Sequence, residues 1–218
     1  MYNYELINNH IVVQIGYLKF LLDTGSENSF WIQSPIESIC IDGNEYSLKS
    51  GYRLDANQIF ECIGTKVDGF IGNDIVSKTS LTIYRDGRID FKVNPLEGNK
   101  VDFVFNHHIF IDVISQGIAG QCVIDTGAKI GYGVSELFEH EMPFTQISDY
   151  SPIWGRIAGD FYQVNLSING QSRVVDLANS HVVERVLNGV NAIMIISIMS
   201  LFDEACVIDF NKECITLD

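Results

Sequence analysis

The sequence is poor in positive charge and has no long apolar run. Lys and Arg number 14 against 28 Asp and Glu, so the formal net charge is −14 at pH 7. A surface of that sign repels phosphates, and we therefore expect no nucleic-acid partner. The most apolar stretch, residues 190–202, is interrupted by polar residues and is shorter than the roughly 18 residues that a membrane helix needs. We therefore expect no membrane partner.

Metal, disulfide and targeting signals are also missing. The five cysteines are odd in number, widely spaced and without a CxxC pair, which favours buried thiols in a reducing compartment. The first residues lack the basic and then apolar profile of a signal peptide, so a cytoplasmic location is expected. His107 and His108 form the only histidine pair, and no ligand pattern surrounds them. We interpret that pair as a solvated turn and expect neither a metal nor a cofactor.

What the sequence does contain is a succession of short strands. Residues 10–16 and 18–22 are strand-like, and Asp-Gly or Asn-Gly dipeptides predict tight hairpins at residues 42–43, 86–87 and 169–170. Helical patterns are short and cover residues 71–78, 134–140 and 180–187. With only four prolines and no low-complexity stretch, the least structured boundary is at residues 95–100. The pattern predicts an all-β protein with a few short helices.

The two halves of the chain repeat one motif. An apolar strand leads into Asp23-Thr24-Gly25-Ser26 and again into Asp125-Thr126-Gly127-Ala128, 102 residues later. A second echo, residues 81–91 and 207–217, lies at an offset of 126, so the second half holds about 24 extra residues between these landmarks. Two apolar residues followed by Asp-Thr-Gly occur by chance in such a chain less than about once in a hundred. Two copies at matching places indicate an internal duplication.

The repeated acid has a chemical interpretation. Two carboxyl groups about 3 Å apart cannot both ionise cheaply, so they share a proton and their pKa values split. Asp23 and Asp125 are therefore the candidates for a shared general base and general acid around one water. Gly lets each loop turn sharply, and the Thr hydroxyl can bond the opposite loop. A single Asp-Thr-Gly would be read more readily as an ordinary turn; the duplicated pair favours the catalytic interpretation.

These motifs resemble those of the acid-protease superfamily, which includes retropepsins and pepsin-like enzymes. The resemblance covers nearly the whole chain, as two retropepsin-like lobes at residues 1–97 and 98–218. It implies two pseudo-twofold-related, β-barrel-like lobes around a central cleft, with Gly72 in a strand that passes beneath the first catalytic loop. It also implies a monomer with an intramolecular dyad. The residue after the first motif, Ser26, resembles the acid-adapted members of the family, whereas Ala128 after the second resembles the neutral-adapted members. This combination predicts an intermediate pH optimum.

The second half departs from the family pattern. No glycine stands at the place that matches Gly72, and either Ser197 or Ile198 replaces it, depending on a one-residue slip. Tyr52 and Trp154 each follow a motif Asp by 29 residues and have a glycine neighbour. Each is either a residue of a substrate-binding flap or a packing aromatic.

Two functions follow from this pattern. The first is an aspartic endopeptidase that hydrolyses extended peptides or proteins through Asp23 and Asp125. The alternative is a catalytically weak or inactive protease-like module that binds extended peptides or a protein partner. A weaker third hypothesis is self-assembly through exposed edge strands.

Overall fold

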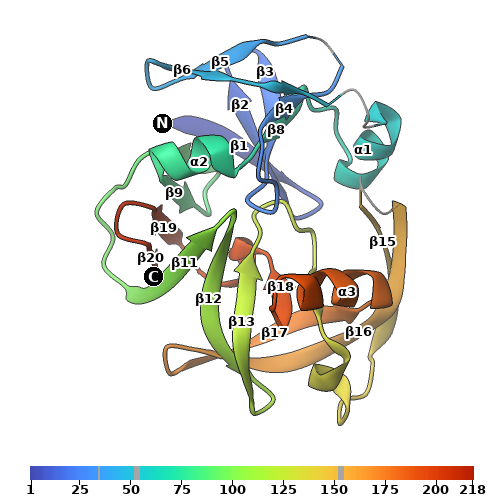
Figure 1. The fold of residues 1–218 in the computed structure, drawn as a ribbon. Coiled ribbons are helices and arrows are strands. Elements are labelled where there is room, and N and C mark those ends of the chain that lie inside the picture. Colours follow the sequence, from blue (N-terminus) through green and yellow to red (C-terminus); the bar gives the residue numbers. More distant parts are fainter. Residues whose placement is uncertain (34, 52–54, 152–154) are drawn as a thin grey trace.

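Strands make up most of the regular structure. The computed structural model describes residues 1–33, 35–51, 55–151 and 155–218. Within these ranges there are 20 strands, three α-helices and two short 3₁₀ helices (Figure 1), which confirms the all-β class. No helix in the described ranges is long and apolar enough to cross a bilayer.

A six-stranded antiparallel sheet joins the two halves of the sequence. Its order is β1-β10-β9-β19-β20-β11, with three strands from each half. The central pairing is between β9 and β19, which lie side by side in Figure 1. The strands are β1 (Tyr2–Ile7), β9 (Leu81–Tyr84), β10 (Arg88–Asp90), β11 (Asn99–Asn106), β19 (Ala205–Asp209) and β20 (Cys214–Leu217).

Each half also forms a sheet of its own with matching order. In the first half the order is β1-β2-β3-β8-β4-β7, and β3 runs parallel to β8. In the second half the order is β11-β12-β13-β18-β14-β17-β16-β15, and β13 runs parallel to β18. An additional pairing of β12 with β16 closes the second sheet into a barrel.

The bounds of these strands complete the description. In the first half they are β2 (His10–Ile15), β3 (Leu18–Leu22), β4 (Phe30–Trp31), β7 (Lys49–Ser50) and β8 (Gly69–Ile71), beside a separate hairpin of β5 (Ser38–Ile41) and β6 (Asn44–Ser47). In the second half they are β12 (His108–Ser115), β13 (Ile118–Ile124), β14 (Gly131–Gly133), β15 (Thr145–Ser151), β16 (Gly155–Ile168), β17 (Gln171–Asn179) and β18 (Met194–Ile196).

The predicted hairpin turns are present, and most predicted helices are found close to their expected ranges. Residues 42–43 join β5 to β6, residues 86–87 lie between β9 and β10, and residues 169–170 join β16 to β17. Helices α2 (Asn73–Thr79) and α3 (His181–Gly189) lie within two residues of their predicted bounds, whereas residues 134–140 contain only a 3₁₀ helix, η1 (Ser135–Phe138). A second 3₁₀ helix, η2 (Ile198–Ser200), follows β18.

The extra residues of the second half form the β15–β16 hairpin. Each half has a hairpin with a positive-φ turn, β5–β6 or β16–β17. In the first half the next strand, β7, runs parallel to β4, and in the second half β17 itself runs parallel to β14; a helix follows in both. Only six residues separate β4 from β5, whereas β15 and the first part of β16 occupy the corresponding place in the second half. The two halves therefore differ where the second half adds this hairpin, on the side of the molecule where β15 contacts α1 (Ala56–Ile63).

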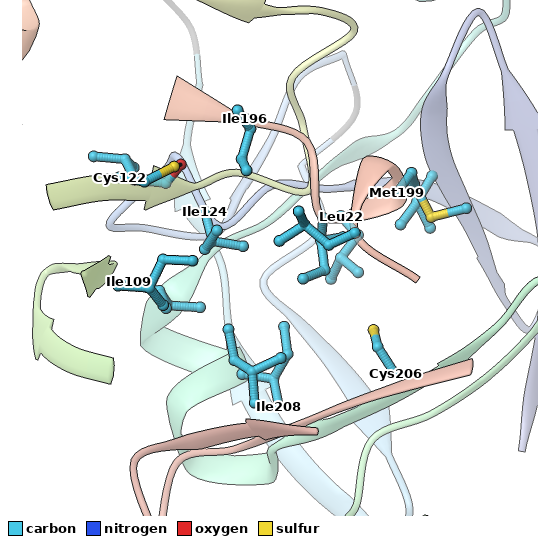
Figure 2. Close-up of a cluster of buried hydrophobic side chains, with 14 of the residues drawn as sticks. Leu22, Ile109, Cys122, Ile124, Ile196, Met199, Cys206 and Ile208 are labelled. Carbon is cyan, nitrogen blue, oxygen red and sulfur yellow. Dashed lines mark hydrogen bonds between the residues drawn. The ribbon is translucent and has the colours of Figure 1, made fainter. Parts of the chain in front are cut away.

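One hydrophobic core lies beneath both Asp-Thr-Gly loops. Figure 2 shows side chains from both halves meeting there, with Leu22 and Ile124 from the strands that precede the loops and Ile208 from the central sheet. All three are fully buried. A smaller cluster in the first half packs Ile59 and Ile63 of α1 against the β2–β3 layer. The core therefore couples the positions of the two loops.

We expect Leu22→Ala to lower the free energy of unfolding by about 2–5 kcal/mol, because it removes buried methyl groups and leaves a cavity. Leu6→Ala is the matched control, since Leu6 is 46% exposed and its replacement is expected to cost under about 1 kcal/mol. Urea unfolding of both variants measures the difference. Equal losses in the two variants would contradict this account of the core.

Candidate active site

Two parallel strand pairs deliver the motif aspartates to one place. Asp23 follows β3 and donates its backbone N–H to the carbonyl of Ile71 at 2.9 Å. Asp125 follows β13 and donates to the carbonyl of Ile196, also at 2.9 Å. The two carboxyl groups lie close enough to interact, since the charge of Asp125 raises the pKa of Asp23. The structure thus brings together the two residues that the sequence paired.

The two threonines lock the loops together through four hydrogen bonds. The backbone N–H of Thr24 donates to Thr126 Oγ1 at 3.0 Å, and the N–H of Thr126 donates to Thr24 Oγ1 at 3.0 Å. Each hydroxyl then donates to the carbonyl that precedes the opposite aspartate, Thr24 to Ile124 and Thr126 to Leu22, both at 2.9 Å. Both threonines are fully buried, so every one of these polar groups depends on the other loop.

The motif glycines allow the loops to approach each other. A Cβ atom on Gly25 would lie 2.3 Å from Asp125 Oδ2, and one on Gly127 would lie 2.6 Å from the Asp23 carboxyl carbon. No side chain fits at either distance. Their backbone N–H groups instead both donate to Asp125 Oδ1, at 3.0 Å from Gly25 and 2.7 Å from Gly127.

Electrostatics differ between the two aspartates. Burial and the charge of Asp125 hold the pKa of Asp23 well above its ordinary value. Burial also raises the pKa of Asp125, but the N–H groups of Gly127 and Gly25 and the hydrogen bond from Asp23 oppose that rise. A pair so close titrates in two coupled steps, and the two backbone donors on Asp125 Oδ1 favour Asp125 as the ionised partner. Both residues are partly exposed to solvent.

The first loop is supported by residues of its own half. Gly72 donates its backbone N–H to Ser29 Oγ at 2.8 Å, and Asn73 donates its backbone N–H to the carbonyl of Ser26 at 2.9 Å. The side chain of Asn73 donates to the carbonyl of Thr24 at 2.7 Å. A Cβ atom on Gly72 would lie 2.7 Å from the Ser26 carbonyl oxygen, so glycine is required there.

The strand register resolves which residue replaces that glycine in the second half. Since Ile196 corresponds to Ile71, Ser197 takes the place of Gly72. Ser197 is buried, and its hydroxyl has no hydrogen-bond partner among the described residues. Gly131 stands where the first half has Ser29, so the hydroxyl acceptor is missing as well. Within the described structure no hydrogen bond joins residues 197–200 to the loop at 126–130.

The second loop is instead supported from the other half of the chain. Asn9 in the turn between β1 and β2, and His10 at the start of β2, reach across to it. Asn9 Nδ2 donates to the carbonyl of Lys129 at 2.7 Å, and His10 Nδ1 lies 2.8 Å from the carbonyl oxygen of Gly127. Sequence reasoning identified neither residue, nor Asn73. Asn73 follows Gly72 directly and could have been inspected, whereas nothing in the pattern marks His10.

The candidate flap residues Tyr52 and Trp154 lie outside the described residues. The elements on either side of Tyr52 are β7 and α1. Those on either side of Trp154 are β15 and β16, which pair antiparallel up to Ser151 and Gly155. The hydroxyl of Tyr132, on β14, donates to Asp149 Oδ2 at 2.8 Å and thereby ties β15 to the sheet of the second half.

The residue after each motif differs between the halves, and a backbone hydrogen bond from Ser26 lowers the pKa of Asp23. Ser26 Oγ donates to the carbonyl of Asn28 at 2.8 Å and so stabilises its own loop. Ala128, which has no hydroxyl, is half-buried at the matching place. Within the described ranges, no three His, Cys, Asp or Glu side chains are arranged to hold a metal ion.

No protein-family model matches this chain, and no curated protein matches it either. The case for function therefore depends on the geometry of the site.

We expect Thr126→Val to destabilise the protein by about 1–3 kcal/mol for each buried group that it leaves unpaired, because Thr24 N–H and the Leu22 carbonyl both lose their partner. Thr145→Val is the matched control, since Thr145 is exposed. Chemical denaturation measures both. A loss no larger in Thr126→Val than in Thr145→Val would show that the loops do not depend on each other.

We also expect Asp23→Asn to raise the free energy of unfolding at pH 7. Because the folded-state pKa of Asp23 lies above its unfolded value, its contribution to stability is present at low pH and is lost as the pH rises through the folded-state value. The advantage of the Asn variant should therefore shrink as the pH falls towards 4. Asp112→Asn, at an exposed position, should change stability by less than about 0.5 kcal/mol. An Asp23→Asn variant less stable than wild type at pH 7 would contradict the shared proton.

Proposed function

We propose that the protein is an aspartic endopeptidase with Asp23 and Asp125 as its catalytic pair. The observation that carries the proposal is the close approach of Asp23 and Asp125 on two loops that buried reciprocal hydrogen bonds hold together. Burial and the charge of Asp125 raise the pKa of Asp23, which supports a shared proton. This arrangement resembles that of the acid-protease superfamily, which the duplicated motif suggested. The proposed fold is that family's, with one lobe in each half of the chain.

The chemistry follows from the positions of the proton and the charge. A water molecule at the pair loses a proton to Asp125 while its oxygen attacks the peptide carbonyl carbon. Asp23 donates its proton to the carbonyl oxygen, which gives a tetrahedral diol. Return of a proton from Asp125 to the amide nitrogen lets the C–N bond break, and Asp23 regains a proton as the carboxylic acid product forms. No metal or cofactor takes part in this scheme.

The substrate we propose is an extended peptide that lies across the pair. An extended chain can add backbone hydrogen bonds to a neighbouring hairpin, while alternate side chains enter pockets. The β15–β16 hairpin is the candidate to cover it, because Asp149 ties that hairpin to the sheet that positions Asp125. The first half has no matching hairpin among its described residues.

We expect Asp23→Asn and Asp125→Asn each to lower kcat by about 10²–10⁴-fold or more on a peptide library. The kcat of Asp112→Asn should stay within about twofold of the wild-type value, since Asp112 is an exposed residue in the middle of β12. Turnover should also fall as the pH rises through the elevated pKa of Asp23, because that residue must hold the proton.

The assay should span pH 3 to 8. Activity that survives both substitutions would overturn the proposal. Peptide binding without turnover, unchanged in the Asn variants, would favour the alternative of a binding module.

A further inference from the structure

We propose that His10 is a positioning residue for Asp125. It belongs to the first half of the chain and supports the second Asp-Thr-Gly loop, which the segment after β18 does not support. The inference rests on the proposed function, since it assigns a role in the same site. It starts from the difference between the two loops.

Among the described residues, each catalytic loop has one side chain that donates a hydrogen bond to a carbonyl of its Asp-Thr-Gly motif. For the first loop the donor is Asn73, which bonds the carbonyl of Thr24. The matching residue in the second half is Ile198, which cannot donate. There the donor is His10, which bonds the carbonyl of Gly127.

The tautomer of His10 follows from its partners. A carbonyl oxygen only accepts, so Nδ1 must carry the hydrogen in the 2.8 Å contact with Gly127. Nε2 faces the Sγ atom of Cys62 on α1 at 4.0 Å, and burial raises the pKa of that thiol to about 11, so it stays protonated. His10 is only 4% exposed, and burial lowers its pKa. The ring is therefore a neutral, fixed donor at neutral pH.

The surroundings of His10 connect it to the site. The carboxylates of Asp149 and Asp125 act to raise the pKa of His10, and the charge of Lys129 acts to lower it. The residue that it holds, Gly127, donates its own N–H to Asp125 Oδ1 at 2.7 Å. The hydrogen bond from His10 fixes the plane of the peptide between residues 127 and 128. The neighbouring peptide, between residues 126 and 127, carries the N–H that orients the Asp125 carboxyl group.

The chain supplies a matched control at the corresponding place of the second half. His108 opens β12 as His10 opens β2, and the strand registers superimpose them. His108 Nδ1 is buried but has no hydrogen-bond partner among the described residues. Its replacement removes an imidazole near the loops without removing a bond to either loop.

The test compares His10→Phe, His10→Asn and His108→Phe. His10→Phe should lower kcat by about 10- to 100-fold with KM nearly unchanged, since misplacement of a catalytic group costs rate more than binding. His10→Asn should restore most of the rate, because Asn Nδ2 can lie where His Nδ1 lies. His108→Phe should lower kcat less than His10→Phe does, because it removes a charge that lowers the pKa of Asp125 but no hydrogen bond to either loop. His10→Gln keeps a polar side chain but moves the hydrogen-bond donor, so its kcat should fall as that of His10→Phe does. It replaces His10→Phe in the comparison if the Phe variant does not fold.

A second measurement does not depend on turnover. Hydrogen exchange of the Gly127 amide should be faster in His10→Phe or His10→Gln than in wild type, and unchanged in His10→Asn. An inactive wild type would overturn the proposed function, while the exchange rates would still report whether His10 holds the loop. Wild-type exchange and wild-type kcat in both donor-lacking variants would overturn the inference.

Discussion

The reciprocal hydrogen bonds between Thr24 and Thr126 are the interaction on which the rest of the site depends. Each buried hydroxyl accepts from the opposite backbone and donates to the carbonyl before the opposite aspartate. Neither loop can satisfy these groups by itself, and an unpaired buried donor or acceptor costs about 1–3 kcal/mol. The close approach of Asp23 and Asp125 follows, because their backbones are fixed by the residues that the threonines bond. Desolvation then raises the pKa values of both aspartates, and the charge of Asp125 raises that of Asp23 further.

Around this symmetric centre the two halves have diverged. The first loop is supported from within its half by Gly72 and Asn73, and the second is supported across the halves by Asn9 and His10. The second half in turn carries the additional β15–β16 hairpin, whose first strand contacts α1 of the first half. Loss of the glycine after β18 therefore does not leave the Asp125 loop unsupported. A duplicated chain is free to diverge in this way, because its two copies need not be identical.

The sequence predicted the parts of the structure that short patterns determine. Two Asp-Thr-Gly motifs after apolar strands predicted that the aspartates meet, and the Asp-Gly and Asn-Gly dipeptides predicted three hairpins because their residues adopt positive φ readily. The choice between Ser197 and Ile198 needed the strand register, since apolar residues on both sides of Ser197 allow the alignment to slip by one residue. Helix α1 was not predicted, because only Ile59 and Ile63 form its buried face and two residues make too short an apolar pattern. His10 was missed because its partner lies 117 residues away and is a backbone carbonyl, which no side-chain pattern reveals.

The central claim is that Asp23 and Asp125 hold one proton between them. Carboxyl carbon shifts of ¹³C-labelled aspartate, followed by NMR across pH 2 to 9, measure this directly. The account predicts that the carbons of both residues respond to two coupled steps, the later one well above the ordinary aspartate range and reported most strongly by Asp23. Two independent single-step titrations near the ordinary value of about 3.9 would contradict it.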